Sequence, residues 1–338
     1  MILVTGGTGL LGSHLLFELI KNNQPVTAIR RSEKNIPGVR QVFSYYTDNP
    51  DAYLDKINWI EADMLSYHDM LEVMEGINQV YHCAATVSFD TRKRAAMIRN
   101  NTAGTAHIVN ACLETGVNKL IHVSSTSAIG NAGPNGIANE TMVFVESKAN
   151  TGYAISKFRS EMEVWRGIQE GLSAAIVNPS IILGPGFWNH GSSSIFTKID
   201  KGLRFYSHGI TGYVGVWDVV KAMIELMDSD ISGERFLVTA ENYTYREIFD
   251  KVADALERKR PDIEGTLLMS EMAWRMDWLK SRFFQIGEHT FTRERVRAAR
   301  NIARFSNEKI KKKLDFEFEP VYSVIEKVAS YYRKTFQK

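Results

Sequence analysis

Tyr153 and Lys157 lie four residues apart, a spacing that puts both side chains on one face of a helix. A tyrosine with the ordinary pKa of about 10 is a weak acid–base group at neutral pH. A neighbouring ammonium would stabilise the phenolate and lower that pKa, so the pair is typical of general acid–base chemistry. Ser125 follows an apolar strand upstream, and we expect its hydroxyl to hold a substrate oxygen. Its neighbours Ser124 and Thr126 compete for this role.

The chain opens with an apolar segment, a cluster of glycines and a helix with an apolar face. A strand is predicted over residues 2–5, and residues 7–12 match the spacing G-x-G-x-x-G. Glycines in such a turn let the backbone approach a pyrophosphate, and the helix N-terminus offers free N–H groups to it. We therefore expect a dinucleotide site, with a ligand-free turn as the alternative, formed by Gly6, Thr8, Gly9, Leu10, Leu11 and Gly12.

The second predicted strand, residues 26–29, should end beside the adenosine ribose of such a dinucleotide. Arg30 and Arg31 follow it, where an acidic residue would favour NAD. Guanidinium groups suit a 2′-phosphate, so the sequence favours NADP. NAD is the alternative if both arginines are only solvated surface charges. Asp63 follows the third strand, where it either contacts the adenine or caps a helix.

Strands and helices alternate over residues 1–180, which predicts an α/β fold with a doubly wound parallel sheet. Residues 32–56 are polar without clear periodicity, so we expect an excursion there. After Pro185 the pattern changes and indicates a smaller C-terminal α+β lobe, and the basic run at 293–313 is expected to be a solvated helix face. Strands are predicted at 2–5, 26–29, 58–61, 79–84, 119–124, 174–179 and 235–239, and helices at 69–75, 95–115, 153–170, 245–257 and 322–336.

The 338 residues carry a formal net charge of +2 and two cysteines, Cys83 and Cys112. So small a charge argues against a nucleic-acid partner, and two cysteines fit a reducing compartment. The sequence has no apolar run near the roughly 18 residues that span a bilayer, and the first strand leaves no room for a signal peptide. We therefore expect a cytoplasmic protein without membrane association. The spacing of cysteines, histidines and carboxylates predicts no metal site.

Nine short segments, taken in order, resemble the extended short-chain dehydrogenase/reductase family, also called the NAD-dependent epimerase/dehydratase family. The resemblance is clearest over residues 1–240 and implies an NAD(P)-binding Rossmann domain at 1–180 and a substrate lobe at 181–338, with some C-terminal elements returning to the first domain. The segments are Thr5–Gly12, Asp63–Met64, His82–Ala85, Asn101–Thr105, Val123–Ser125, Tyr153–Lys157, Asn178–Pro179, Gly184–Gly186 and Val216–Val219.

The resemblance implies a role for each matching residue. Tyr153 would be the general acid/base, Lys157 would tune it and bind the nicotinamide ribose, and Ser125 matches the catalytic Ser/Thr. Asn101 matches an asparagine that supports a proton relay. The residues expected to contact the cofactor as well are Met64, Ala84, Ala85 and Pro179.

Departures from the family pattern indicate the branch. Thr126 and Ser127 follow Ser125 where the 4,6-dehydratases carry an Asp–Glu pair, so dehydration lacks its acid and base. Thr211 stands seven residues before Asp218, where many sugar-nucleotide epimerases place an arginine against the diphosphate. Cations that could substitute for it are Lys198, Lys201, Arg204 and Arg235.

The segments at 82–89 and 178–185 look like the dihydroflavonol-reductase-like and hydroxysteroid-dehydrogenase-like branches, which act on a carbonyl or alcohol of an apolar or aromatic small molecule. Substrate contacts are expected from Thr86, Thr126, Phe187 and Trp188, with ordinary packing as the alternative for the two aromatic residues.

Three functions remain open at this point. The first is an NADP-dependent oxidoreductase that transfers hydride to or from a carbonyl or alcohol. The second is an epimerase of a sugar or sugar nucleotide, and the third is an NADP-binding sensor without catalysis. The resemblance also implies a homodimer formed by the helices that carry Asn101 and Tyr153.

Overall fold

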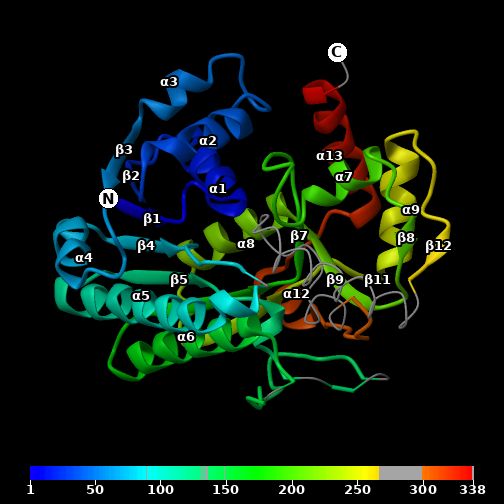
Figure 1. The fold of residues 1–338 in the computed structure, drawn as a ribbon. Coiled ribbons are helices and arrows are strands. Elements are labelled where there is room, and N and C mark those ends of the chain that lie inside the picture. The colour runs from blue at the N-terminus through cyan, green and yellow to red at the C-terminus, as the bar shows by residue number, and fades with distance from the viewer. Residues whose placement is uncertain (89, 131, 134–135, 148, 266–298, 337–338) are drawn as a thin grey trace.

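A central sheet of seven strands, all parallel, organises this computed structural model, which describes residues 1–88, 90–130, 132–133, 136–147, 149–265 and 299–336. The strand order is β10-β6-β5-β4-β1-β2-β3, so the chain starts in the middle and builds outward in both directions. This arrangement confirms the predicted doubly wound α/β fold (Figure 1). The strands are β1 (Ile2–Thr5), β2 (Val26–Arg30), β3 (Ile57–Glu61), β4 (Gln79–His82), β5 (Lys119–Val123), β6 (Ala174–Pro179) and β10 (Glu234–Val238).

Helices cover both faces of the sheet, because its strands carry apolar residues on both sides. In β1, Ile2 and Val4 belong to one hydrophobic cluster and Leu3 to the other, as expected where successive side chains point to opposite faces. One face is covered by α4 (Tyr67–Met74), α5 (Arg94–Thr115) and α6 (Gly152–Gln169), and the other by α1 (Leu10–Lys21), α2 (Ile36–Phe43), α3 (Pro50–Leu54) and α8 (Val216–Asp228).

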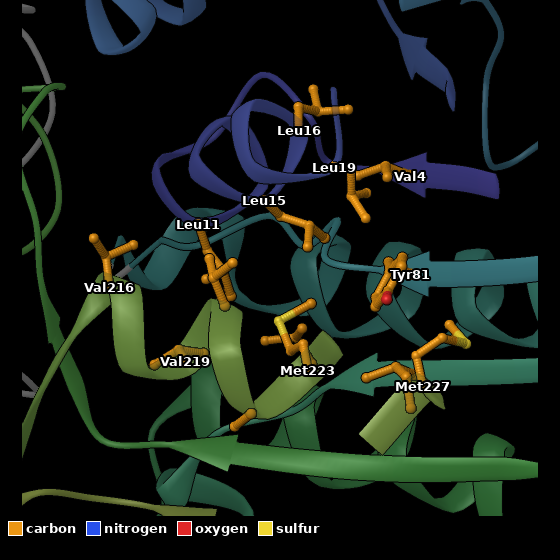
Figure 2. Packing of buried hydrophobic residues seen from close by; sticks show 14 of the residues in the cluster. Val4, Leu11, Leu15, Leu16, Leu19, Tyr81, Val216, Val219, Met223 and Met227 are labelled. Carbon is orange, nitrogen blue, oxygen red and sulfur yellow. The ribbon is translucent and has the colours of Figure 1, made fainter. Parts of the chain in front are cut away.

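Helix α8 brings residues from the second half of the chain into the core beneath the N-terminal helix. Figure 2 shows Leu11 and Leu15 of α1 pointing toward Val219 and Met223 of α8. Leu15, Val219 and Met223 are fully buried, and Leu11 nearly so. Strand β10 makes the same return, because it pairs in parallel with β6 at the edge of the sheet.

Residues 32–56 are more ordered than the sequence predicts. They form a short 3₁₀ turn (Glu33–Asn35) and the helices α2 and α3, and Val39, Val42 and Phe43 of α2 are fully buried. The expected excursion is therefore wrong in this respect. The signal was weak because the apolar side chains repeat over little more than one helical turn, which is too short a window to show periodicity.

The remaining elements form a second lobe around an apolar cluster that includes Trp188, Phe196 and Tyr332. Its three-stranded sheet has the order β11-β9-β7, and β8 pairs with β12. Of the basic run, residues 299–313 are described, and a helix begins only at Glu308, so the expected helix face is wrong for residues 299–307. The elements are β7 (Ile181–Leu183), α7 (Ser194–Asp200), β8 (Phe205–Tyr206), β9 (Ile210–Gly215), β11 (Glu241–Thr244), α9 (Tyr245–Ala255), β12 (Ile263–Glu264) and α13 (Val321–Phe336). Helix α12 (Glu308–Leu314) instead packs beside β10, with Ile310 in the hydrophobic cluster of the main sheet.

In the part of the chain that the structure describes, no helix combines the length and apolar character needed to cross a bilayer.

Candidate active site

The glycine turn closes tightly between β1 and α1. Gly6 has a φ of 70°, and a Cβ there would lie 2.6 Å from the backbone nitrogen of Ala84 at the end of β4. A Cβ on Gly12 would overlap the carbonyl oxygen of Gly6. The N–H of Gly9 donates to that same carbonyl at 3.0 Å. Only glycine fits at positions 6 and 12, and the packed turn leaves the start of α1 facing the end of the central strands.

This turn fits a dinucleotide diphosphate. Gly9 is the N-cap of α1 and makes no side-chain cap hydrogen bond, while Thr8, Gly9 and Leu10 are at least partly exposed. The first turn of an α-helix leaves N–H groups without intrahelical partners, and its dipole favours an anion there. The backbone of Leu10, Leu11 and Gly12 would therefore hold the phosphates.

At the end of the predicted cofactor site where the adenosine ribose would lie, the side chain of Arg30 already has an ion-pair partner. Arg30 at the end of β2 is paired with Glu33, with 2.5 Å between Nη2 and Oε1, and its guanidinium lies 6.0 Å from the ring centre of Trp59. Arg31 and Asp63 are exposed, and the Asp63 carboxylate accepts from the backbone N–H of Leu65. Sequence reasoning missed Glu33, although a carboxylate three residues after an arginine was a readable signal.

Ser125 and Tyr153 meet in space, although 28 positions separate them in the chain. The phenol of Tyr153 makes a side-chain hydrogen bond with Ser125. The Ser125 hydroxyl also accepts from the N–H of Ser127 at 3.1 Å as the cap of the short turn Thr126–Ala128, which fixes its direction. Burial raises the pKa of Tyr153, and the hydrogen bond from Ser125 acts in the opposite sense. The phenol is therefore protonated at neutral pH, whereas the sequence predicts a lowered pKa.

Lys157 is buried one helical turn beyond Tyr153, and its Nζ donates to the carbonyl oxygen of Val123 at 2.8 Å. Burial lowers the pKa of this ammonium to about 8. The sequence places the ammonium beside the phenolate, but here it donates a hydrogen bond to the end of β5. The reason is that a buried ammonium needs an acceptor, and the strand end supplies a backbone carbonyl.

Asn101 of α5 is tied to the backbone of Thr86. Its Oδ1 accepts from the Thr86 N–H at 2.8 Å, and its Nδ2 donates to the Thr86 carbonyl at 2.9 Å and to Ser156 Oγ at 3.2 Å. This geometry makes Asn101 a positioning residue for the segment after β4. The proton-relay role stays a prediction.

The other residues expected to contact the cofactor lie at the ends of strands or shortly after them. The N–H of Ala84 donates to Thr5 Oγ1 at 3.2 Å, which holds Ala84 and Ala85 beside the glycine turn. Met64 follows β3 and packs against Gly104 of α5. Pro179 is the last residue of β6 and is buried.

Trp188 is packed in a hydrophobic core, which is the alternative that the sequence leaves open for it, whereas Phe187 is half-buried and its substrate contact stays a prediction. Trp188 is 3% exposed, donates from its indole N–H to the Tyr45 hydroxyl at 2.8 Å and packs edge-on against Tyr332. Phe187 packs against Gly38 of α2. Phe187 contacts α2 and Trp188 contacts Tyr45 just beyond it, so both rings join this segment to the second lobe. The spacing of adjacent aromatic residues alone cannot reveal which surface they cover.

One charged residue near Ser125, Glu161, escaped sequence reasoning, and its partner Arg235 was expected only as a possible cation for a diphosphate. Glu161 is fully buried on α6, and its Oε1 lies 2.9 Å from Nη1 of Arg235 on β10. The available signal was helical spacing, because Glu161 follows Lys157 by four residues and Tyr153 by eight. Within the described residues, no group of three histidines, cysteines or carboxylates is arranged to hold a metal ion.

A glycine turn at the head of a doubly wound sheet, with a serine, a tyrosine and a lysine gathered at the strand ends, defines a nucleotide-cofactor enzyme of the Rossmann class. The sequence profile of the NAD dependent epimerase/dehydratase family matches residues 2–238. The chain belongs to this family, which confirms the resemblance, and is an enzyme of the extended short-chain dehydrogenase type.

Among similar proteins, sterol demethylase protein B of Methylococcus capsulatus is 30% identical over 289 residues, which cover 83% of each chain. A putative dihydroflavonol 4-reductase of Synechocystis is 30% identical over 182 residues, or 54% of this chain and 49% of that one. The structure of UDP-glucose 4-epimerase from Thermotoga maritima aligns with a TM-score of 0.76 at 20% identity, covering 99% of both chains. This last likeness concerns the fold.

Proposed function

We propose that this chain is an NADP-dependent oxidoreductase that acts on a carbonyl or alcohol of an apolar or aromatic small molecule. The hydrogen bond between Ser125 and the Tyr153 phenol carries the proposal. A substrate oxygen held by both hydroxyls would sit between a hydrogen-bond donor and a proton donor, which is the arrangement that carbonyl reduction needs.

The side chains divide the work in the reduction direction. The bound nicotinamide supplies the hydride. Ser125 orients the carbonyl oxygen, and Tyr153 donates its proton to that oxygen as the alcohol forms. Since burial raises the pKa of the phenol further above neutral pH, the resting protein carries the proton that reduction needs, and the charge of Lys157 is needed to ease its release. The ammonium of Lys157, with a pKa of about 8, is largely charged at neutral pH and would stabilise the phenolate that remains.

The names of two relatives support the substrate class. The sterol demethylase protein is named for a polycyclic apolar alcohol, and the reductase is named for an aromatic one. For this chain, we infer a substrate whose reacting oxygen is carried on an apolar or aromatic framework.

The charges around the site also favour this class over a nucleotide sugar. A diphosphate needs cations, and Arg235, one of the candidates from the sequence, is already bound to Glu161 and to the carbonyls of Glu140 and Met142. Thr211 takes the place of the epimerase arginine and lies in β9. An epimerase would also retain NAD(H) and show no net absorbance change at the nicotinamide band, which separates the two functions.

The test is Tyr153→Phe, assayed by NADPH oxidation with a panel of aromatic and steroidal ketones. We expect turnover to fall below 1% of the wild-type rate, roughly the loss of a general acid, with the NADPH dissociation constant unchanged within about twofold. Tyr67→Phe is the matched control, because that tyrosine lies on α4 and its hydroxyl donates to Glu114. Near-normal turnover by Tyr153→Phe would remove the assignment.

A further inference from the structure

Glu161 is a carboxylate with no exposed surface, on the same helix as Tyr153 and Lys157. We propose that Glu161, balanced by Arg235, is the positioning residue that sets the distance between Ser125 and Tyr153. This inference rests on the proposed function, because it assigns catalytic work to those two hydroxyls.

The Glu161 carboxylate holds both sides of Ser125. Its Oε2 accepts from the Ser124 hydroxyl at 2.7 Å and from Nδ2 of Asn178 at 2.8 Å. The same Nδ2 donates to the carbonyl oxygen of Ser125 at 3.1 Å. One side chain of α6 therefore fixes the residue before Ser125 and, through Asn178, the backbone of Ser125 itself.

This arrangement links the two reacting groups through a short path. Tyr153 sits on the first turn of α6, and Glu161 sits about two turns later on the same rigid helix. Ser125 has no helix or strand of its own to hold it, since it follows the end of β5. The carboxylate thus joins the segment that carries Ser125 to the helix that carries Tyr153.

Arg235 compensates the charge of the buried Glu161 carboxylate and adds further hydrogen bonds to the network around Ser125. Its Nη1 lies 2.9 Å from Glu161 Oε1, while Nε and Nη2 donate to the carbonyl of Glu140 at 3.0 and 2.8 Å. Nη2 also donates to the carbonyl of Met142 at 2.9 Å. The arginine comes from β10, so the second half of the chain takes part in fixing Ser125.

Stability alone is a poor reason to keep such a pair. Apolar side chains of similar volume often replace a buried ion pair without loss of stability, whereas breaking the pair strands a charge. A carboxylate that accepts hydrogen bonds from Ser124, Asn178 and Arg235 fixes the orientation of these groups, which an apolar side chain cannot do.

The decisive variant is Glu161→Gln, compared with Glu163→Gln on the same helix, whose carboxylate pairs with Arg166 on the protein surface. We expect kcat for ketone reduction to fall about 10- to 100-fold for Glu161→Gln, because a small displacement of a catalytic group has that effect. KM and the NADPH dissociation constant should stay within about twofold of wild type. Glu163→Gln should leave all three unchanged, and Glu161→Asp should recover part of kcat.

Amide hydrogen exchange of the full-length protein supplies a readout that needs no substrate. In Glu161→Gln, we expect faster exchange confined to residues 124–129, with residues 1–30 unchanged. Unchanged exchange and kcat, or faster exchange spread evenly over the chain, would overturn the proposal. Should Glu161→Gln not fold, Ser124→Ala removes one of the same hydrogen bonds and decides by the same measurements. If the wild type reduces no ketone, the proposed function fails, and the exchange result still decides whether Glu161 positions Ser125.

Discussion

Burial shifts the pKa of two side chains on which the proposed chemistry depends. Tyr153 is held protonated and Lys157 loses part of its affinity for a proton, both because charge is disfavoured away from water. Arg30 is already paired with Glu33. The reacting residues could be chosen from sequence spacing, but the direction of each shift depends on neighbours that spacing does not contain.

Replacement of Lys157 by methionine should increase stability while abolishing turnover. The folded pKa is lowered from 10.5 to about 8, so the unfolded chain holds a proton between these values that the folded chain has released. The associated stability is present above pH 10.5 and is lost as pH falls through 8. At pH 7 we therefore expect Lys157→Met to unfold with about 2 kcal/mol more free energy than wild type, allowing for the lost hydrogen bond to Val123. Urea titrations from pH 7 to 10.5 should show this difference shrinking as pH rises, and a constant difference would contradict the assignment.

Cofactor preference should respond in opposite directions to two substitutions near the ribose end. Glu33→Gln releases the Arg30 guanidinium and removes a carboxylate that repels a 2′-phosphate, so we expect NADPH to bind about 3- to 10-fold tighter with NADH unaffected. Arg30→Asp should remove the preference for NADPH that we propose. The dissociation constants of NADPH and NADH are measured for each variant by titration, with the fluorescence of the nicotinamide as the signal. Glu18→Gln is the control, because it removes one partner of an exposed ion pair on α1. If Arg30→Asp leaves the preference intact, the argument for Arg30 fails.

At the scale of elements, the site is where strand ends and helix starts converge. The glycine turn follows strand β1, Ser125 follows β5, and Tyr153 and Lys157 lie on α6. These elements keep their positions because helices cover both faces of the sheet. The helix beneath the glycine turn is α8, which comes from residues that follow the predicted domain boundary at 180.

Met223→Ala should show that α8 belongs to the core of the nucleotide-binding sheet. Met223 is fully buried against α1, and truncation of a buried methionine costs about 2–5 kcal/mol. We expect that loss in urea unfolding, together with weaker NADPH binding, because α1 loses its support. Met162→Ala, at an exposed position on α6, should cost less than about 1 kcal/mol. An equally small effect at both positions would show that α8 does not support α1.

At the scale of the whole molecule, the chain crosses between its two parts more than once. Strand β10 leaves the second lobe to join the main sheet, and α2 contacts the second lobe through Phe187. Asp218, at the start of α8, accepts from the backbone N–H of Glu319 at 3.1 Å, just before α13. These contacts tie the C-terminal helix to the nucleotide-binding part.

We expect Asp218 to make the stability of the folded chain depend on pH. Burial raises its pKa from 3.8 to about 6, so its stabilising contribution is present below pH 3.8 and is lost as pH rises through 6. Asp218→Asn keeps a carbonyl acceptor for Glu319, and we expect it to be about 1–2 kcal/mol more stable than wild type at pH 7. Thermal unfolding at pH 4 should show no such difference. A pH-independent difference would place the effect elsewhere.

The sequence by itself determined the features that arise within one element or between neighbours along the chain. The glycine turn, the parallel strands of the sheet and the Tyr153–Lys157 spacing depend on periodicity and local sterics, so they could be read from the printed residues. Only the tertiary structure decided that Glu161 meets Arg235, that Trp188 is packed in a core, and that Lys157 donates to Val123. These contacts join residues far apart in the chain, and burial at such contacts sets both the pKa shifts and the geometry around Ser125.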